Sequence, residues 1–211
     1  MDRTAGHLSK NYQEAVSSLV WAKLVGIGSA GTGKTCLIKH FCESKYPMEG
    51  QTETEDWEFN TGYQPTVGVD YGFKIQTVNG TEMRVHMWDL SGSNEYMDVR
   101  NELYNGSDAI FVTYDVTNAT TFEALDGWLR EAHRFATGNP DIFIVGNKTD
   151  LSKKRTVPSS EGKKFALQNR CLFFETSAAT GEGVDTMFDQ ILQEIAKKRK
   201  STSANSNKRS R

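Results

Sequence analysis

The chain has little cysteine and no long apolar segment. Its 211 residues include three cysteines, Cys36, Cys42 and Cys171, and none is in a C-x-x-C pair or at the spacing of a zinc site. Such a sequence offers no disulfide framework, which favours a reducing compartment. Residues 1–20 are polar and no run approaches about 18 apolar residues, which argues against a signal peptide and a transmembrane helix. We expect a soluble intracellular protein, in the cytoplasm or the nucleus.

Basic charge is scarce outside the C-terminus. Residues 197–211 carry seven lysines or arginines and no acid, which leaves 18 basic against 27 acidic residues, a net charge of −9, elsewhere. An acidic body argues against a specific nucleic-acid-binding face, while the basic tail can attract anionic membranes weakly. The sequence divides into an N-terminal extension over residues 1–20, one domain over 21–197 and a disordered basic tail over 198–211.

Residues 28–35 read GSAGTGKT and match the phosphate-binding pattern G-x-x-x-x-G-K-[ST] at all four fixed positions. Its glycines let backbone N–H groups converge on phosphate oxygens. Lys34 adds positive charge, and the Thr35 hydroxyl can bind a magnesium ion that bridges the outer phosphates. A glycine-rich turn that contains a lysine by chance is the alternative, but four fixed positions rarely coincide. The residues assigned to the phosphates are Ala30, Gly31, Thr32, Gly33, Lys34, Thr35 and Cys36.

Short apolar runs alternate with helical patterns along the rest of the chain. Strands are predicted at residues 24–27, 69–78, 83–90, 109–115, 142–146 and 171–175, and helices after residue 34, before 104, and at 121–136, 158–169 and 183–200. Asn79-Gly80 predicts a hairpin turn between the second and third strands. Residues 47–63 hold five acids and no base, and they read as a long loop. This alternation predicts an α/β fold with a mostly parallel sheet and a ligand at the carboxyl ends of its strands.

Three further motifs follow predicted strands. In the first, Asp89 can hold magnesium through water while the Gly92 N–H reaches a terminal phosphate. In the second, Asn147-Lys148-Thr149-Asp150, the carboxylate can accept from the N1–H and the 2-amino group of guanine, two donors that adenine lacks. In the third, the Ala178 N–H can donate to the guanine O6. Taken alone, the first two motifs are equally compatible with an ordinary turn, and for the third a turn of small residues would be the default interpretation.

The four motifs in this order make residues 21–197 resemble the Ras-like small GTPases, and Pro65-Thr66-Val67-Gly68-Val69-Asp70 resembles their Rab branch. Residues 99–104, 121–129 and 174–183 resemble the RJL (Rab- and DnaJ-like) GTPases, although we expect no DnaJ domain here. The resemblance implies a six-stranded sheet flanked by five helices. It also implies a signal-transduction switch, a monomer, that binds GTP or GDP with Mg²⁺ and contacts effector and regulator proteins through its switch regions.

The resemblance also assigns roles to single residues. Thr66 would close on magnesium and the terminal phosphate, so the implied metal ligands are Thr35, Thr66 and Asp89. Tyr46 falls where the family places an aromatic ring against guanine, with Phe59 as the alternative because residues 47–63 make the alignment ambiguous. Catalysis would involve Lys34, Thr66, Gly92 and Ser93, and the base would be held by Asn147, Lys148, Asp150, Ser177, Ala178 and Ala179.

Three positions depart from the family. Ala30 stands where the family has glycine or serine, Ala179 replaces a lysine, and Ser93 replaces the glutamine that orients the attacking water. A serine has no amide to accept from water and donate to phosphate, so we expect very slow GTP hydrolysis. A constitutively GTP-bound docking module without meaningful GTPase activity is the alternative, and Asp150 opposes a P-loop kinase that uses ATP. No cysteine follows Cys171, so we expect no prenyl anchor.

Overall fold

A computed structural model describes residues 20–43, 62 and 64–209, with side chains up to residue 201. Tyr46, Phe59, the N-terminal extension and nearly all of the acidic loop at residues 47–63 lie outside the described residues. The strands are β1 (Val20–Ile27), β2 (Val69–Val78), β3 (Thr81–Leu90), β4 (Ala109–Asp115), β5 (Asp141–Asn147) and β6 (Leu172–Thr176). The α-helices are α2 (Lys34–Glu43), α3 (Met97–Leu103), α4 (Ala119–Glu123), α5 (Leu125–Phe135), α6 (Ser159–Gln168) and α7 (Val184–Arg209).

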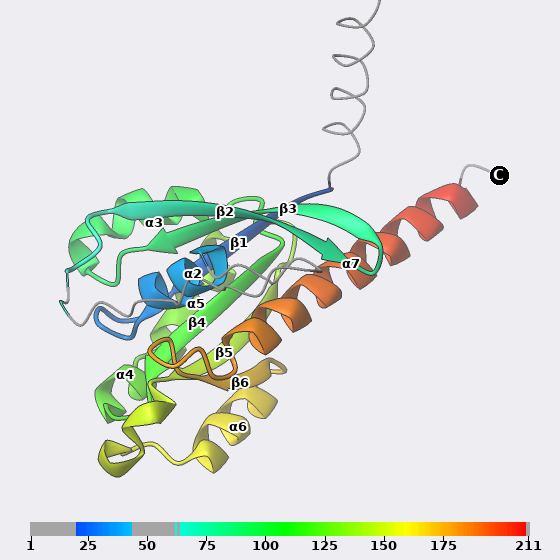
Figure 1. The fold of residues 1–211 in the computed structure, drawn as a ribbon. Coiled ribbons are helices and arrows are strands. Elements are labelled where there is room, and N and C mark those ends of the chain that lie inside the picture. The colour runs from blue at the N-terminus through cyan, green and yellow to red at the C-terminus, as the bar shows by residue number, and fades with distance from the viewer. Residues whose placement is uncertain (1–19, 44–61, 63, 210–211) are drawn as a thin grey trace, which may run out of the picture.

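The six strands form one sheet in the order β2-β3-β1-β4-β5-β6 (Figure 1). Only β2 is antiparallel to its neighbour, and the other pairs are parallel. The predicted hairpin joins β2 to β3 through Asn79 and Gly80, whose φ angles of 50° and 76° are both positive, as a two-residue type I′ turn requires. The predicted α/β fold with a mostly parallel sheet is confirmed.

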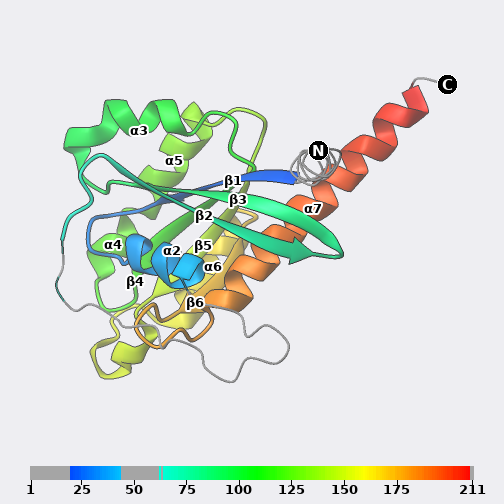
Figure 2. The ribbon, with the colours of Figure 1, turned by 45° about the horizontal axis from the view of Figure 1, so that its top comes forward.

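Helices cover both faces of the sheet. One apolar core lies between the sheet and the helices α2 and α7, and it includes Phe41 and Phe188, whose rings stack at 4.3 Å. The other core lies under α5 and α6 and includes Trp128 and Tyr114. Figure 2 shows α2 and α7 together on one side of the sheet, with α3 and α5 on the other. Strand β4 is buried at all seven positions between the two layers, which explains why its sequence lacks the apolar–polar alternation of a half-exposed strand.

The helices differ from the prediction in two places. The helix predicted over residues 121–136 is divided into α4 and α5 at Ala124, where ψ opens to −13°, so the described residues form six α-helices rather than five. It also starts earlier, because the Asn118 side chain accepts from the Thr120 N–H and caps α4. None of the helices in the described ranges combines the length and apolarity needed to span a membrane.

Helix α7 also extends to Arg209, past the residue where the disordered tail was predicted to begin (Figure 1). Its side chains bond to the body of the protein. Lys198 donates to Asn139 O at 2.6 Å, and Arg199 donates to both oxygens of Asp108 at 2.8 and 2.9 Å. These long-range contacts hold the end of the helix predicted over residues 183–200 against the body of the protein.

Candidate functional site

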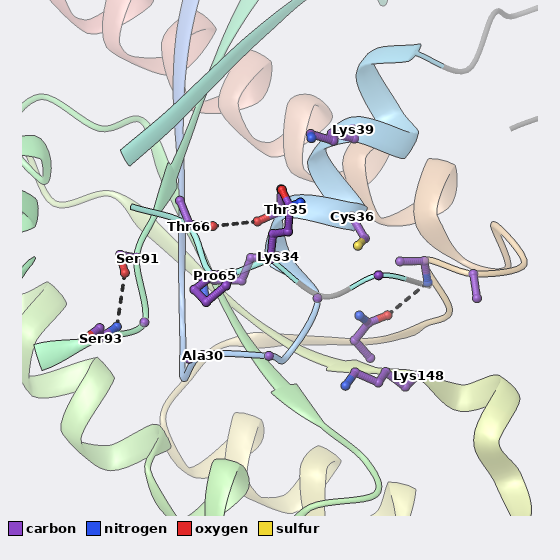
Figure 3. A pocket seen from close by; sticks show the side chains of 18 of the residues that line it. Ala30, Lys34, Thr35, Cys36, Lys39, Pro65, Thr66, Ser91, Ser93 and Lys148 are labelled. Carbon is purple, nitrogen blue, oxygen red and sulfur yellow. Dashed lines mark hydrogen bonds between the residues drawn. The ribbon is translucent and has the colours of Figure 1, made fainter. Parts of the chain in front are cut away.

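A cavity of about 740 Å³ opens at the carboxyl ends of the parallel strands (Figure 3). Most of the predicted site residues line it: Ala30, Gly31, Gly33, Lys34, Thr35, Cys36, Thr66, Gly92, Ser93, Asn147, Lys148, Asp150, Ala178 and Ala179. Thr32, Asp89 and Ser177 are buried and outside its lining, and Tyr46 is not among the described residues. The lining also includes residues outside the four motifs that sequence reasoning did not assign to the site, among them Lys39, Glu43, Tyr96 and Leu151.

The P-loop, residues 28–35, is held in place by one buried amide. Gly33 has a φ of 94°, and a Cβ atom there would lie 2.3 Å from the Asn147 side-chain nitrogen, so the position needs glycine. That nitrogen donates to Thr32 O at 2.9 Å. The Asn147 Oδ1 in turn accepts from Thr176 Oγ1 and from the Ala178 N–H, both at 3.1 Å. Asn147 therefore links the P-loop to the loops after β5 and β6.

Lys34 supplies a buried positive charge beside the P-loop. Its Nζ donates to the carbonyl oxygens of Gly28 at 2.8 Å and Ser29 at 3.1 Å. Burial lowers the pKa of Lys34 to about 8, and the charge of Asp89 opposes that shift. The ammonium group thus loses much of its hydration, which strengthens its attraction for an anion in the cavity.

Thr35, Thr66 and Asp89 bring three oxygen-bearing side chains to one point. The hydroxyls of Thr35 and Thr66 lie 3.0 Å apart, as the dashed line in Figure 3 shows, and both can donate to Asp89 Oδ2. The other carboxylate oxygen, Asp89 Oδ1, is buried without a hydrogen-bond partner. Burial raises the pKa of Asp89, against hydrogen bonds from both threonines and the charge of Lys34.

This donor set fits a magnesium ion. Mg²⁺ prefers hard oxygen ligands and is commonly held by one or two carboxylates together with phosphates and water. Within the described residues, no three His, Cys, Asp or Glu side chains gather as a metal site, so Asp89 and the two hydroxyls are the relevant donors. An ion there would satisfy the orphaned Oδ1 atom of Asp89.

The other end of the cavity carries the residues assigned to the base. Lys148 adopts a left-handed backbone with φ 71°, and its Nζ pairs with Asp115 Oδ2 at 2.7 Å. Asp150 is exposed, and its Oδ1 accepts from Ser177 Oγ at 2.6 Å. The Ala178 N–H, expected to reach guanine O6, donates to Asn147 in this structure. The pairing of Asp115 with Lys148 was not predicted. The signal for it was position, because Asp115 is the last residue of β4 just as Asn147 is the last residue of β5.

Gly92 and Ser93 lie where the chain leaves β3 and passes the P-loop. A Cβ atom at Gly92 would lie 2.3 Å from Ala30 N, so only glycine permits this approach. The Ser93 hydroxyl accepts from the Glu95 N–H at 3.3 Å and caps a short 3₁₀ turn, Asn94–Tyr96. The Ser93 N–H donates to Ser91 Oγ at 3.3 Å (Figure 3). The Ser93 hydroxyl is thus already engaged in a hydrogen bond to the backbone of the turn that follows it.

Comparison with known proteins agrees with this geometry. Residues 23–197 match the model of the Ras family. The Ras-related protein Rab-4A of Homo sapiens is 36% identical over 176 residues, 83% of this chain and 75% of the relative. Rab-4B of Homo sapiens is 34% identical over 176 residues, with coverage of 83% and 76%. The DnaJ homolog subfamily C member 27-A of Xenopus laevis is 36% identical over 178 residues, 82% of this chain and 60% of that protein.

Proposed function

We propose that this chain, which belongs to the Ras family of small GTPases, binds GTP together with Mg²⁺ and hydrolyses the GTP very slowly. Proteins of this family are nucleotide-binding switches. We assign it to the Rab and RJL type. The similarity to both Rab-4A and a DnaJ homolog supports that assignment. Its partners would be effector and regulator proteins that contact the switch regions around Thr66 and after Asp89.

The observation that carries the proposal is the link made by Asn147. This single side chain bonds to the P-loop at Thr32, and its oxygen accepts from Thr176 and Ala178 beside the base-recognition residues. One cavity therefore presents an anion-binding loop at one end and the Asp150 carboxylate at the other. A guanine nucleotide has the matching parts, phosphates and a base with two adjacent donors.

Different residues of the cavity would bind the phosphates, the magnesium ion and the base. Lys34 and the P-loop N–H groups would hold the phosphates, while Thr35, Thr66 and Asp89 would hold the magnesium ion. The ion would neutralise charge on the outer phosphate oxygens. Asp150 would select guanine, and the aliphatic part of Lys148, oriented by its ion pair with Asp115, would lie along the base.

Slow hydrolysis follows from Ser93. Its side chain has no amide, and its hydroxyl caps the 3₁₀ turn that follows. This second use of the hydroxyl favours the alternative function, a docking module that stays loaded with GTP. The two functions share one site and differ in which nucleotide the protein holds over time.

Analysis of the nucleotide that copurifies with the protein tests the proposal. We expect GTP or GDP in the denatured extract, with a predominance of GTP favouring the docking module and of GDP favouring the cycling enzyme. Chelation of magnesium by EDTA should speed its release, because the metal ligands then contribute nothing to phosphate binding. A purified protein that holds no nucleotide and prefers ATP to GTP in competition titrations would contradict the proposal.

Nucleotide affinity should fall as the pH rises above about 8. Burial lowers the pKa of Lys34 to about 8 from its ordinary value of 10.5, so the unliganded protein loses this charge in that range. Bound phosphate would raise the pKa again, so that binding takes up a proton and weakens by up to about tenfold at pH 9. In the unfolded chain Lys34 keeps its proton up to about pH 10.5. The free-energy cost of burying the charged lysine in the folded protein therefore disappears as the pH rises from about 8 to about 10.5.

Titration with fluorescent GDP at about pH 7 and pH 9 measures this dependence. Lys34→Arg is the control, because a guanidinium stays charged across the range. Its affinity is expected to be lower but nearly independent of pH. Equal affinity of the wild type at both pH values would show that Lys34 keeps its proton and that its burial does not govern binding.

A further inference from the structure

We propose that the ion pair between buried Arg100 and half-buried Glu131 positions the Gly92 N–H beside the P-loop and thereby favours binding of a nucleotide with a terminal phosphate. Arg100 lies on α3 and Glu131 on α5, and neither lines the cavity. Both would act as positioning residues, through the backbone around Gly92. This role rests on the proposed function, because it assumes that the site holds GTP or GDP.

The Arg100 guanidinium joins α5 to the two residues that flank Gly92. Arg100 is 1% exposed, and its Nε and Nη2 donate to the two oxygens of Glu131 at 2.6 and 2.9 Å. Its remaining nitrogen, Nη1, donates to Ser93 O at 2.6 Å and to Ser91 O at 3.4 Å. A planar guanidinium held in two parallel bonds has little freedom to turn. The carbonyl groups on either side of Gly92 are therefore tied to a helix.

Neighbouring side chains hold this pair from two more directions. The Tyr104 hydroxyl donates to Glu131 Oε1 at 2.8 Å, so the carboxylate is fixed independently of Arg100. The guanidinium carbon lies 4.6 Å from the centre of the Trp128 ring. The Trp128 indole N–H in turn lies 3.4 Å from Ser29 Oγ, in the P-loop. The cluster of Arg100, Glu131, Tyr104 and Trp128 thus contacts both the segment around Gly92 and the P-loop. The relative placement of these two segments determines where the Gly92 N–H lies.

The expected consequence differs between the two nucleotides. Gly92 packs so closely on Ala30 that a Cβ atom would lie 2.3 Å from its nitrogen, and the Gly92 N–H is the group assigned to the terminal phosphate. A segment already held in its binding position loses less conformational freedom when the ligand arrives. GDP has no terminal phosphate and gains nothing from this arrangement. Loosening the cluster should therefore weaken GTP binding selectively.

Glu131→Gln tests the role, because the amide keeps the shape of the carboxylate but loses its charge and one acceptor. The affinities for fluorescent GDP and for a non-hydrolysable GTP analogue are measured by titration with magnesium present. We expect the analogue to bind about tenfold more weakly, within the usual range of coupling between two sites, while GDP affinity stays within about twofold. Arg100→Lys, which keeps a positive charge beside Glu131 but cannot make the forked contact, should show the same selective loss.

Asp108→Asn is the matched control. Asp108 also accepts two bonds from one arginine, Arg199, but it precedes β4, at the opposite end of that strand from the site, so this variant should keep the wild-type ratio of the two affinities. A wild-type ratio in both Glu131→Gln and Arg100→Lys would overturn the positioning role. Equal loss of both nucleotides would also overturn it, since that result indicates general destabilisation of the site. A wild-type protein that binds neither nucleotide would refute the proposed function itself.

Discussion

Replacing Asp150 by asparagine is expected to reverse the base preference, lowering the affinity for GTP and raising that for xanthosine triphosphate. The Asp150 carboxylate lines the cavity and accepts from Ser177 at 2.6 Å, which orients it next to the loop after β6. A carboxylate accepts from both adjacent donors of guanine, whereas an amide can donate to the oxo group that replaces the 2-amino group in xanthine. Loss of a charge-assisted pair of hydrogen bonds to the base should weaken GTP binding by at least about 100-fold.

Competition titrations with GTP and xanthosine triphosphate measure this change. Asp141→Asn offers a matched control, because Asp141 begins the same strand, β5, whose other end leads into the base motif. Its pairing with Lys198 is partly exposed, and its loss should leave both affinities unchanged. Undiminished GTP affinity in Asp150→Asn would remove this carboxylate from the base contact.

Much of the fold could be predicted because local patterns determine it. The sequence of β4 lacks apolar–polar alternation and so indicates a strand covered on both faces, and Asn79-Gly80 indicates a two-residue turn because both residues tolerate positive φ. The division between α4 and α5 escaped prediction, since the apolar period continues across Ala124 while only the backbone changes. The C-terminal extent of α7 escaped it too, because residues 201–209 are polar and carry no apolar helical period.

The residues of the site likewise fall into those that the sequence could predict and those that it could not. Residues of the four motifs could be assigned from spacing, because strand, turn and glycine positions constrain each motif locally. Asp115 could not be assigned, since its role depends on Lys148 of the neighbouring strand end. Arg100 and Glu131 are 31 residues apart, and in sequence each looks like an ordinary helical charge. Pairings of this kind depend on how helices pack, which periodicity does not encode.

Introducing glutamine at Ser93 should accelerate GTP hydrolysis by at least about tenfold without changing GTP affinity. We expect the wild type to hydrolyse GTP below about 10⁻⁴ per second, under the intrinsic rate of Ras proteins that possess this glutamine. The longer side chain adds an amide that can accept from the attacking water and donate to the phosphate. Lys34, Thr35 and the P-loop backbone remain unchanged in the variant, so ground-state binding and turnover should separate.

Asn94→Gln is the positional control, because it gives the next residue, inside the 3₁₀ turn that Ser93 caps, a glutamine side chain by lengthening the amide already present there by one methylene. We expect no gain in rate from it. A gain in Asn94→Gln equal to that in Ser93→Gln would show that the position of the amide is unimportant, and the assignment of Ser93 to the water-orienting position would be wrong.

Single-turnover GTP hydrolysis, measured beside GTP affinity for the wild type and Ser93→Gln at matched magnesium, tests most directly whether this protein is a guanine-nucleotide switch limited by Ser93. The expected result is equal GTP affinity in both proteins, a wild-type rate below about 10⁻⁴ per second and a rate at least about tenfold higher in the variant. A wild type that hydrolyses GTP at an ordinary Ras rate and gains nothing from glutamine would contradict it, and another group, such as Glu95 in the cavity lining, would then orient the water.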